Sequence, residues 1–239
     1  APEVVAARDV QSILGLANAR GVPSAMLRWH YRSRHESLIA TSNAAFYENR
    51  LLVLPSPRPR SPALGLSLVH VEGETDKGVN AAEAAAVADA VIRHAKESPR
   101  DTLGVAAFSV MQRDAILDAL DRARAAAPET DAFFAGHQDE PFFVKNLENV
   151  QGDERDAIFI SIGYARRGTE RLRMNFGPVS AEGGERRLNV LITRAKKRCV
   201  VFSDITADDI DLSRSDNVGG EAALKTFLAN AAAQDGAPR

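Results

Sequence analysis

Short apolar runs alternate with longer helical stretches along this chain of 239 residues, and that alternation limits the folds open to it. Runs rich in Val, Ile, Leu and Phe are typical of buried strands, whereas Ala-rich stretches with one apolar face are typical of helices. Strands that alternate with helices form a parallel sheet with helices packed on its faces. We therefore expect an α/β fold with a central, mostly parallel sheet flanked by helices, its strands at residues 66–71, 103–108, 142–144, 157–162 and 199–202.

The remaining segments complete this pattern. Between the strands we expect helices at residues 80–97 and 110–126. Prolines at positions 55, 57, 59 and 62 break the pattern, so residues 54–65 are expected to form an exposed, mobile loop. A chain with 45% hydrophobic residues can bury a substantial core, and residues 1–239 are expected to form a single domain. The other elements expected are helices at 3–18, 35–47 and 221–233 and a strand at 25–29.

Charge and composition limit how this chain can contact nucleic acid and in which compartment we expect it. The formal net charge is -2, so no global basic field attracts nucleic acid, and any such contact must be local. The single cysteine, Cys199, lies in an apolar run and is expected in the core, which suits a reducing cytoplasm. No signal peptide and no apolar run of about twenty residues is present, so we expect a cytoplasmic protein without a membrane span.

One helical segment combines apolar residues with arginines. After Gly183 and Gly184, a helical spacing puts Leu188, Leu191, Ile192 and Ala195 on one apolar stripe. Arg187 and Arg194 are seven residues apart and border this stripe. Such arginines can aim a fixed positive charge into a cleft. The alternative is that they are ordinary surface charges on an amphipathic helix.

Two further polar clusters are expected at ends of the sheet. Tyr31 and Arg32 follow the expected strand at 25–29 and precede the helix at 35–47. Residues 151–156, with the sequence QGDERD, lie between the apolar runs 142–144 and 157–162. Ligands of open α/β sheets bind at the strand ends where strands give way to helices. The clusters therefore predict a binding site there.

Together these three segments resemble the second RecA-like domain of superfamily 1 helicases, in the branch that includes the RNA-surveillance and replication-associated helicases. WHYRSRHESLIATSNAAFY resembles motif IV, LENVQGDERDAIFIS motif V, and GGERRLNVLITRAKKRCVVFSD motif VI. Their spacing fits that family across nearly the whole chain. The stretch FGPVSAEGGERRLNVLITRAK is most similar to large bacterial helicase-like proteins with appended modules, including nuclease-like ones. The resemblance implies a RecA-like fold of the P-loop NTPase type.

The phosphate-binding signature of such enzymes is not in this sequence. There is no Gly-x-x-x-x-Gly-Lys-Ser/Thr (Walker A) segment to hold the β- and γ-phosphates, and no apolar strand ending in Asp-Glu (Walker B) to hold Mg²⁺. The resemblance implies that both belong to an N-terminal RecA-like domain ahead of Ala1, which holds most of the ATP and Mg²⁺. We expect this chain alone to be inactive.

The resemblance assigns the catalytic role to two arginines. Hydrolysis of ATP develops negative charge on the transferred phosphoryl group, and a planar guanidinium contacts such oxygens through two donors. The matching positions of motifs IV and VI are Arg32 and Arg194. The alternatives are that Arg32 pairs with Glu36, and that Arg194 pairs with Glu185 or a neighbouring helix.

The resemblance also implies contacts with the rest of the nucleotide. Tyr31 would stack on the purine, although it could equally be a core tyrosine. Glu154 would accept hydrogen bonds from the ribose hydroxyls, and Gly152 would permit close approach of the backbone. Gln151 would orient this loop. The alternative is a solvated turn in which Glu154 pairs with Arg155.

Single-stranded DNA or RNA would cross the other end of the interdomain cleft. Such strands are held by hydroxyls, amides and backbone N–H groups that contact phosphates without reading bases. Ser109 and Gln112 match the family positions of such contacts. Asn149 stands where the family has a small hydroxyl before the Gln-Gly of motif V, although an amide can also donate.

Two functions of other classes remain open. A RecA-like domain can serve as a non-catalytic scaffold for nucleic acid or protein, although Arg32 and Arg194 argue against it. A metal-dependent nuclease would need carboxylates such as Asp208, Asp209 and Asp211, or Asp153, Glu154 and Asp156. Neither group has the strand-borne acid and Glu-x-Lys of a common nuclease core, and 208–211 reads as a turn cap. We expect no metal site in this chain.

Overall fold

The computed structural model describes residues 13–166, 172–215 and 218–233. At its centre lies a five-stranded sheet in which every pair of neighbouring strands is parallel. This arrangement confirms the expected α/β fold with a parallel sheet. From one edge to the other the strands are β1 (Gly65–His70), β7 (Ala195–Ser203), β6 (Arg155–Ser161), β4 (Leu103–Ala107) and β5 (Phe143–Asn146).

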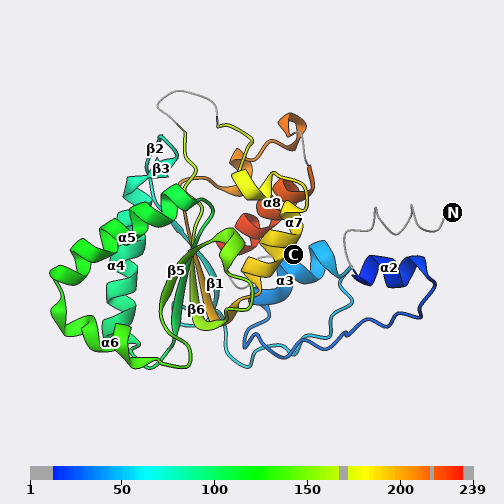
Figure 1. The fold of residues 1–239 in the computed structure, drawn as a ribbon, viewed down its shortest axis with the longest axis horizontal. Helices are drawn as coiled ribbons and strands as arrows, with labels where there is room; N and C mark the ends of the chain where they lie inside the picture. The colour runs from blue at the N-terminus through cyan, green and yellow to red at the C-terminus, as the bar shows by residue number, and fades with distance from the viewer. Residues whose placement is uncertain (1–12, 167–171, 216–217, 234–239) are drawn as a thin grey trace.

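Helices cover both faces of the sheet (Figure 1). On one face lie α4 (Ala81–Glu97), α5 (Val110–Ala125) and α6 (Asp131–Gly136). On the other lie α3 (Ser37–Phe46), α7 (Gly184–Ile192) and α8 (Val218–Ala232). The central strands are therefore apolar on both sides, which is why they read as continuous runs in the sequence.

Each face of the sheet has its own hydrophobic core, as the alternation along β6 shows. Ile158 and Ile160 pack toward α7 and α8, whereas Ala157 and Phe159 pack toward α4 and α5. Successive side chains of a strand point to opposite faces, so one strand supplies both cores. Cys199 is buried in the first of these cores, as expected.

The remaining elements are short. The helix α2 (Ile13–Ala19) has no buried residue and lies apart from the sheet (Figure 1). Strands β2 (Thr75–Asp76) and β3 (Val79–Asn80) form an antiparallel hairpin between β1 and α4. Five single turns of 3-10 helix complete the described elements: Pro128–Thr130, Leu147–Asn149, Gly177–Val179, Ala207–Asp209 and Leu212–Arg214. No helix among the described residues is long and apolar enough to cross a membrane.

At the N-terminal side one expected element was wrong, and another lies mostly outside the described residues. No strand forms at residues 25–29, where Trp29 makes only one isolated bridge to Leu52 and Leu27 is 91% exposed. A strand needs a neighbour to satisfy its backbone, and this segment pairs with Leu52 at its end only. The expected helix at 3–18 falls mostly outside the described residues, and α2 is the part within them. Residues 54–64 hold no helix or strand of more than a bridge, in line with the Pro-rich loop.

The arginine-bearing helix ends earlier than its periodicity predicts. α7 ends at Ile192, and the Thr193 hydroxyl donates to the carbonyls of Asn189 and Val190 in its last turn. Ala195 therefore belongs to β7 and not to the helical stripe. Arg194 lies between helix and strand, whereas Arg187 stays on the helix and donates to the carbonyls of Pro178 and Glu182.

Candidate functional site

Arg32 and Glu154 meet although they are 122 residues apart in the sequence. The Nε atom of Arg32 lies 2.5 Å from Oε2 of Glu154, and both side chains are partly buried. Arg32 is held near the sheet because the N–H of Arg34 donates to the carbonyl of Lys196 in β7 (2.8 Å). Glu154 immediately precedes β6. The alternatives in which Arg32 pairs with Glu36, or Glu154 with Arg155, are not what the structure contains.

Arg194 lies beside this pair. It immediately precedes β7, and its carbonyl accepts the N–H of Arg155 (3.2 Å) at the start of β6. Its guanidinium donates to the Val190 carbonyl (2.8 Å) and to the Thr193 hydroxyl (3.1 Å), which fixes its direction. Burial lowers the pKa of Arg194, and the positive charge of Arg32 lowers it further.

We call Arg32, Glu154 and Arg194 the amino-edge cluster. Within this cluster two guanidiniums, each sensing the other's charge, lie near a single carboxylate, so the three side chains together carry one excess positive charge in a half-buried place, with Asp153 as a further negative charge nearby. Arginine stays protonated even when its pKa falls, so the excess is permanent. Such an arrangement suits an anion with several oxygens, such as a phosphate.

The place of this cluster in the fold corrects one expectation. The sequence suggested strand ends that give way to helices, which in a parallel sheet are the carboxyl ends. Glu154 and Arg194 instead lie just before the amino ends of the neighbouring strands β6 and β7. The correction follows from the early end of α7 and from the loop 147–154, which returns the chain to the amino edge before β6.

The other residues predicted to hold a nucleotide lie next to the cluster in the chain. Tyr31 is 82% exposed, which rules out the core tyrosine. Gln151 is exposed in the turn before Glu154. Gly152 has a φ of +90°, a conformation that L side chains rarely adopt, with open space where a Cβ would stand. The side chains of Tyr31 and Gln151 and the backbone at Gly152 are therefore accessible to a ligand.

The three residues predicted to hold nucleic acid differ in their burial and in their hydrogen-bond partners. Ser109 caps the N-terminus of α5 by accepting the N–H of Gln112, and it follows the carboxyl end of β4. Asn149 is exposed and its side chain donates to Asn146. Gln112 is fully buried, and its amide bonds to Asn80 and Ser161. Its predicted contact with nucleic acid is corrected here, because its polar atoms are used inside the fold.

Glu83 was not among the residues predicted from the sequence; it lies in the first turn of α4 and is completely buried. Its Oε1 accepts hydrogen bonds from the Ser161 hydroxyl (2.6 Å) and the Gly163 N–H (2.8 Å). Burial raises the pKa of Glu83 to about 8. The available signal was its position among the alanines that form the buried face of this helix.

Four of the carboxylates considered for a nuclease, Asp153, Asp156, Asp209 and Asp211, make local structural contacts. Thr206 and Asp209 form a capping box on a 3-10 turn, and Asp211 caps the next turn. Asp153 pairs with Lys145 and Asp156 with Lys197. In the part of the chain that the structure describes, no group of three or more His, Cys, Asp or Glu side chains could hold a metal ion.

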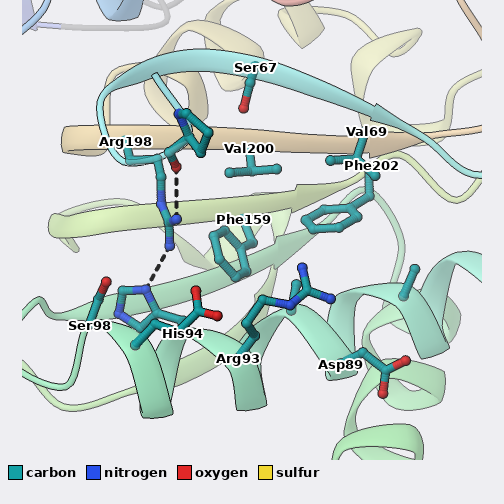
Figure 2. A pocket seen from close by; sticks show the side chains of 14 residues that line it. Ser67, Val69, Asp89, Arg93, His94, Ser98, Phe159, Arg198, Val200 and Phe202 are labelled. Carbon is teal, nitrogen blue, oxygen red and sulfur yellow. Dashed lines mark hydrogen bonds between the residues drawn. The ribbon is translucent and has the colours of Figure 1, made fainter. Parts of the chain in front are cut away.

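A cavity of about 390 Å³ opens between α4 and the sheet, away from these residues. Figure 2 shows Val200 and Phe202 on its sheet side, and Arg93 and His94 projecting from α4. The Nδ1 atom of His94 lies 2.7 Å from the guanidinium of Arg198. None of the lining residues belongs to the amino-edge cluster, so we base the candidate site on the paired charges and not on this cavity.

Comparisons with known proteins agree with this architecture. Residues 11–206 match the sequence profile of the AAA domain family, and the chain belongs to that family. It is 32% identical over 232 residues to a Mycoplasma genitalium protein named an uncharacterized ATP-dependent helicase, covering 94% of this chain and 20% of that protein. The homologue from Mycoplasma pneumoniae is 32% identical over 230 residues, with the same coverage. The chain thus spans about a fifth of the length of these relatives.

One solved structure is also similar, the C-terminal domain of a possible DNA helicase from Lactobacillus plantarum. It shares 17% identity and a TM-score of 0.40, over 72% of this chain and 86% of that one. The family membership and the parallel sheet between two helical layers define a helicase-like α/β domain of the RecA type.

Proposed function

We propose that this chain is the C-terminal motor half of an ATP-dependent helicase or translocase that acts on single-stranded DNA or RNA. In this proposal an N-terminal RecA-like domain of the same polypeptide holds ATP and Mg²⁺, and this domain closes over them. The curated relatives are named as ATP-dependent helicases and are about five times as long as this chain, which leaves room for such a domain in them.

The observation that carries the proposal is the amino-edge cluster. Arg32 and Arg194 come from distant segments and converge beside Glu154, and the charges of Arg32, Glu154 and Asp153 all act on Arg194. ATP hydrolysis moves negative charge onto the transferred phosphoryl group and the leaving oxygen, and fixed guanidiniums stabilise that charge. Both arginines are therefore assigned as catalytic residues that reach across the cleft.

The neighbouring residues complete the proposed nucleotide contacts. Tyr31 stacks on the base, Glu154 accepts from the ribose hydroxyls, and Gln151 with Gly152 forms the turn that faces the nucleotide. The Arg32–Glu154 ion pair then marks a resting arrangement. When ATP arrives, Arg32 exchanges the carboxylate for a phosphate oxygen and Glu154 turns to the ribose.

The scaffold alternative predicts a different result when the arginines are changed. Arg194→Ala in the full-length protein should lower nucleic-acid-stimulated ATP turnover about a thousandfold, the lower end for a lost arginine finger, while nucleotide binding weakens much less. Arg186→Ala is the matched control, because Arg186 lies on the same segment but is 77% exposed. A steady-state ATPase assay measures both. Turnover of Arg194→Ala within a few-fold of the control would refute the catalytic assignment and favour a scaffold.

A further inference from the structure

A buried polar network lies at the opposite end of β6 from the amino-edge cluster. Glu83 in α4 accepts hydrogen bonds from the Ser161 hydroxyl and from the Gly163 N–H. The Ser161 hydroxyl in turn accepts from Nε2 of Gln112 (3.1 Å) in α5. Gln112 also pairs with both backbone groups of Asn80 in β3, at 2.8 and 3.1 Å. We call Asn80, Glu83, Gln112 and Ser161 the carboxyl-edge network.

This network connects three parts of the chain: the loop after β6, the β2–β3 hairpin and the start of α5. The loop after β6 begins at Gly163, whose carbonyl accepts from Thr75 in the β2–β3 hairpin (3.2 Å). The same Thr75 hydroxyl accepts the N–H of Ala165 (2.7 Å). A Cβ on Gly163 would lie only 2.9 Å from the Gln112 side chain, so there is no space for a larger residue at this position. The start of α5, capped by Ser109, is held through Gln112.

The chemistry of Glu83 suits a neutral carboxylic acid. Its other oxygen, Oε2, has no hydrogen-bond partner among the described residues, so no donor stabilises a negative charge there. Burial raises the pKa of Glu83 to about 8, and the negative charge of Asp204, after β7, raises it further. Asp204 is the charged side chain that acts on Glu83, because the other network members are neutral amides and a hydroxyl.

We propose that Glu83 is a positioning residue for the nucleic-acid response of this motor. It holds the described start of the loop after β6 and the start of α5 in the position from which Ser109 and residues 164–166 contact the nucleic-acid strand. This role rests on the proposed function. It differs from general stability because the two sites lie at opposite ends of β6: Glu154 precedes its first residue, and Ser161 is its last. A displaced network therefore weakens the response to nucleic acid without disturbing the nucleotide contacts.

The test uses the full-length protein and measures the concentration of single-stranded nucleic acid that gives half-maximal ATPase stimulation. Glu83→Gln keeps an acceptor for Ser161 and Gly163 and cannot ionise, so it should match the wild type near neutral pH. Glu83→Met keeps the length but removes the acceptor. It should raise the half-maximal concentration about tenfold, the order expected for lost buried hydrogen bonds. The KM for ATP and the unstimulated turnover should change little.

The pH profile separates positioning from a merely structural role. Glu83 is neutral below its pKa of about 8, so the wild-type response is present there and declines as the pH rises through that value. The half-maximal concentration should rise for the wild type between about pH 7 and about pH 9 and stay flat for Glu83→Gln. If Glu83→Met does not fold, Ser161→Ala, which removes one of the two donors to Glu83, takes its place.

Asp156→Asn provides the control for lost stability, because Asp156 bonds to Thr102 and Lys197 at the other end of β6. The proposal is overturned if Glu83→Met behaves as the wild type, if Glu83→Gln follows the wild-type pH profile, or if Asp156→Asn with an equal loss of Tm gives the same change. If single-stranded nucleic acid does not stimulate the ATPase of the wild-type protein, the proposed function itself is refuted. A stimulated wild type with an unchanged Glu83→Met variant would refute only the role of Glu83.

Discussion

At the scale of single residues, the structure contains an interaction that the sequence could not reveal. The motif resemblance assigned Arg32 to a phosphate and Glu154 to a ribose, as separate contacts of one nucleotide. In the structure they bond to each other, across 122 positions of the sequence. Nothing local to either residue predicts this, because the pairing depends on the segment at 30–34 docking on β7. Buried Gln112 shows the same limit, since its spacing alone could not say which way it points.

The role of Glu154 can be tested with an analogue of the substrate. If its carboxylate accepts from the ribose hydroxyls, the full-length protein should prefer ATP over 2′,3′-dideoxy-ATP by about tenfold in KM, the worth of a hydrogen bond to a charged group. Glu154→Ala should abolish most of that preference, because the hydroxyls lose their acceptor. Steady-state kinetics with both nucleotides gives the comparison. A preference that survives in the variant would place the ribose elsewhere.

At the scale of secondary-structure elements, the sequence was most reliable where strands are buried on both faces. β4 and β6 lie within two residues of their expected positions, because a short continuous apolar run is typical of a strand buried on both faces. The expected strand at 25–29 does not form because, although the segment is apolar, its backbone pairs with a neighbour only at the single bridge between Trp29 and Leu52. The end of α7 was misplaced because Ala195 fits the helical period, whereas the helix ends at Ile192 and the Thr193 hydroxyl donates to carbonyls of its last turn.

Two glycines control how α7 and α8 pack against the turn at Gly177–Val179. A Cβ on Gly184 or on Gly220 would lie 1.9 Å from the carbonyl oxygen of Val179, which is backbone and cannot move aside. Gly220→Ala should therefore lower the free energy of unfolding by about 2 kcal/mol or more through overpacking. Urea denaturation of the chain measures this change.

Gly136→Ala is the matched control for that experiment. Gly136 ends the helix α6, and a Cβ there meets nothing within 4 Å. Replacing it should leave the stability unchanged or raise it by about 0.5 kcal/mol, because alanine restricts the unfolded chain. Equal effects of the two substitutions would mean that α8 does not pack on the Val179 carbonyl as the structure has it.

At the scale of the whole molecule, the amino-edge cluster and the carboxyl-edge network lie at opposite ends of the same sheet. The amino edge carries the converging arginines, and the carboxyl edge carries the buried network that holds Ser109 and the loop after β6. The net charge of -2 allowed only local contacts with anions, and the amino-edge cluster is such a local feature. The central claim is that this cluster stabilises the transition state of a nucleotide held mainly by another domain.

Binding of a transition-state mimic tests that claim most directly. The full-length protein, titrated with fluorescent ADP in the presence and absence of aluminium fluoride, should bind the ADP–metal fluoride complex at least about a hundredfold more tightly than ADP. In Arg32→Ala and Arg194→Ala most of that difference should disappear, while the affinity for ADP alone stays within a few-fold. Variants that retain the full wild-type preference for the metal fluoride complex would contradict the assignment of both arginines.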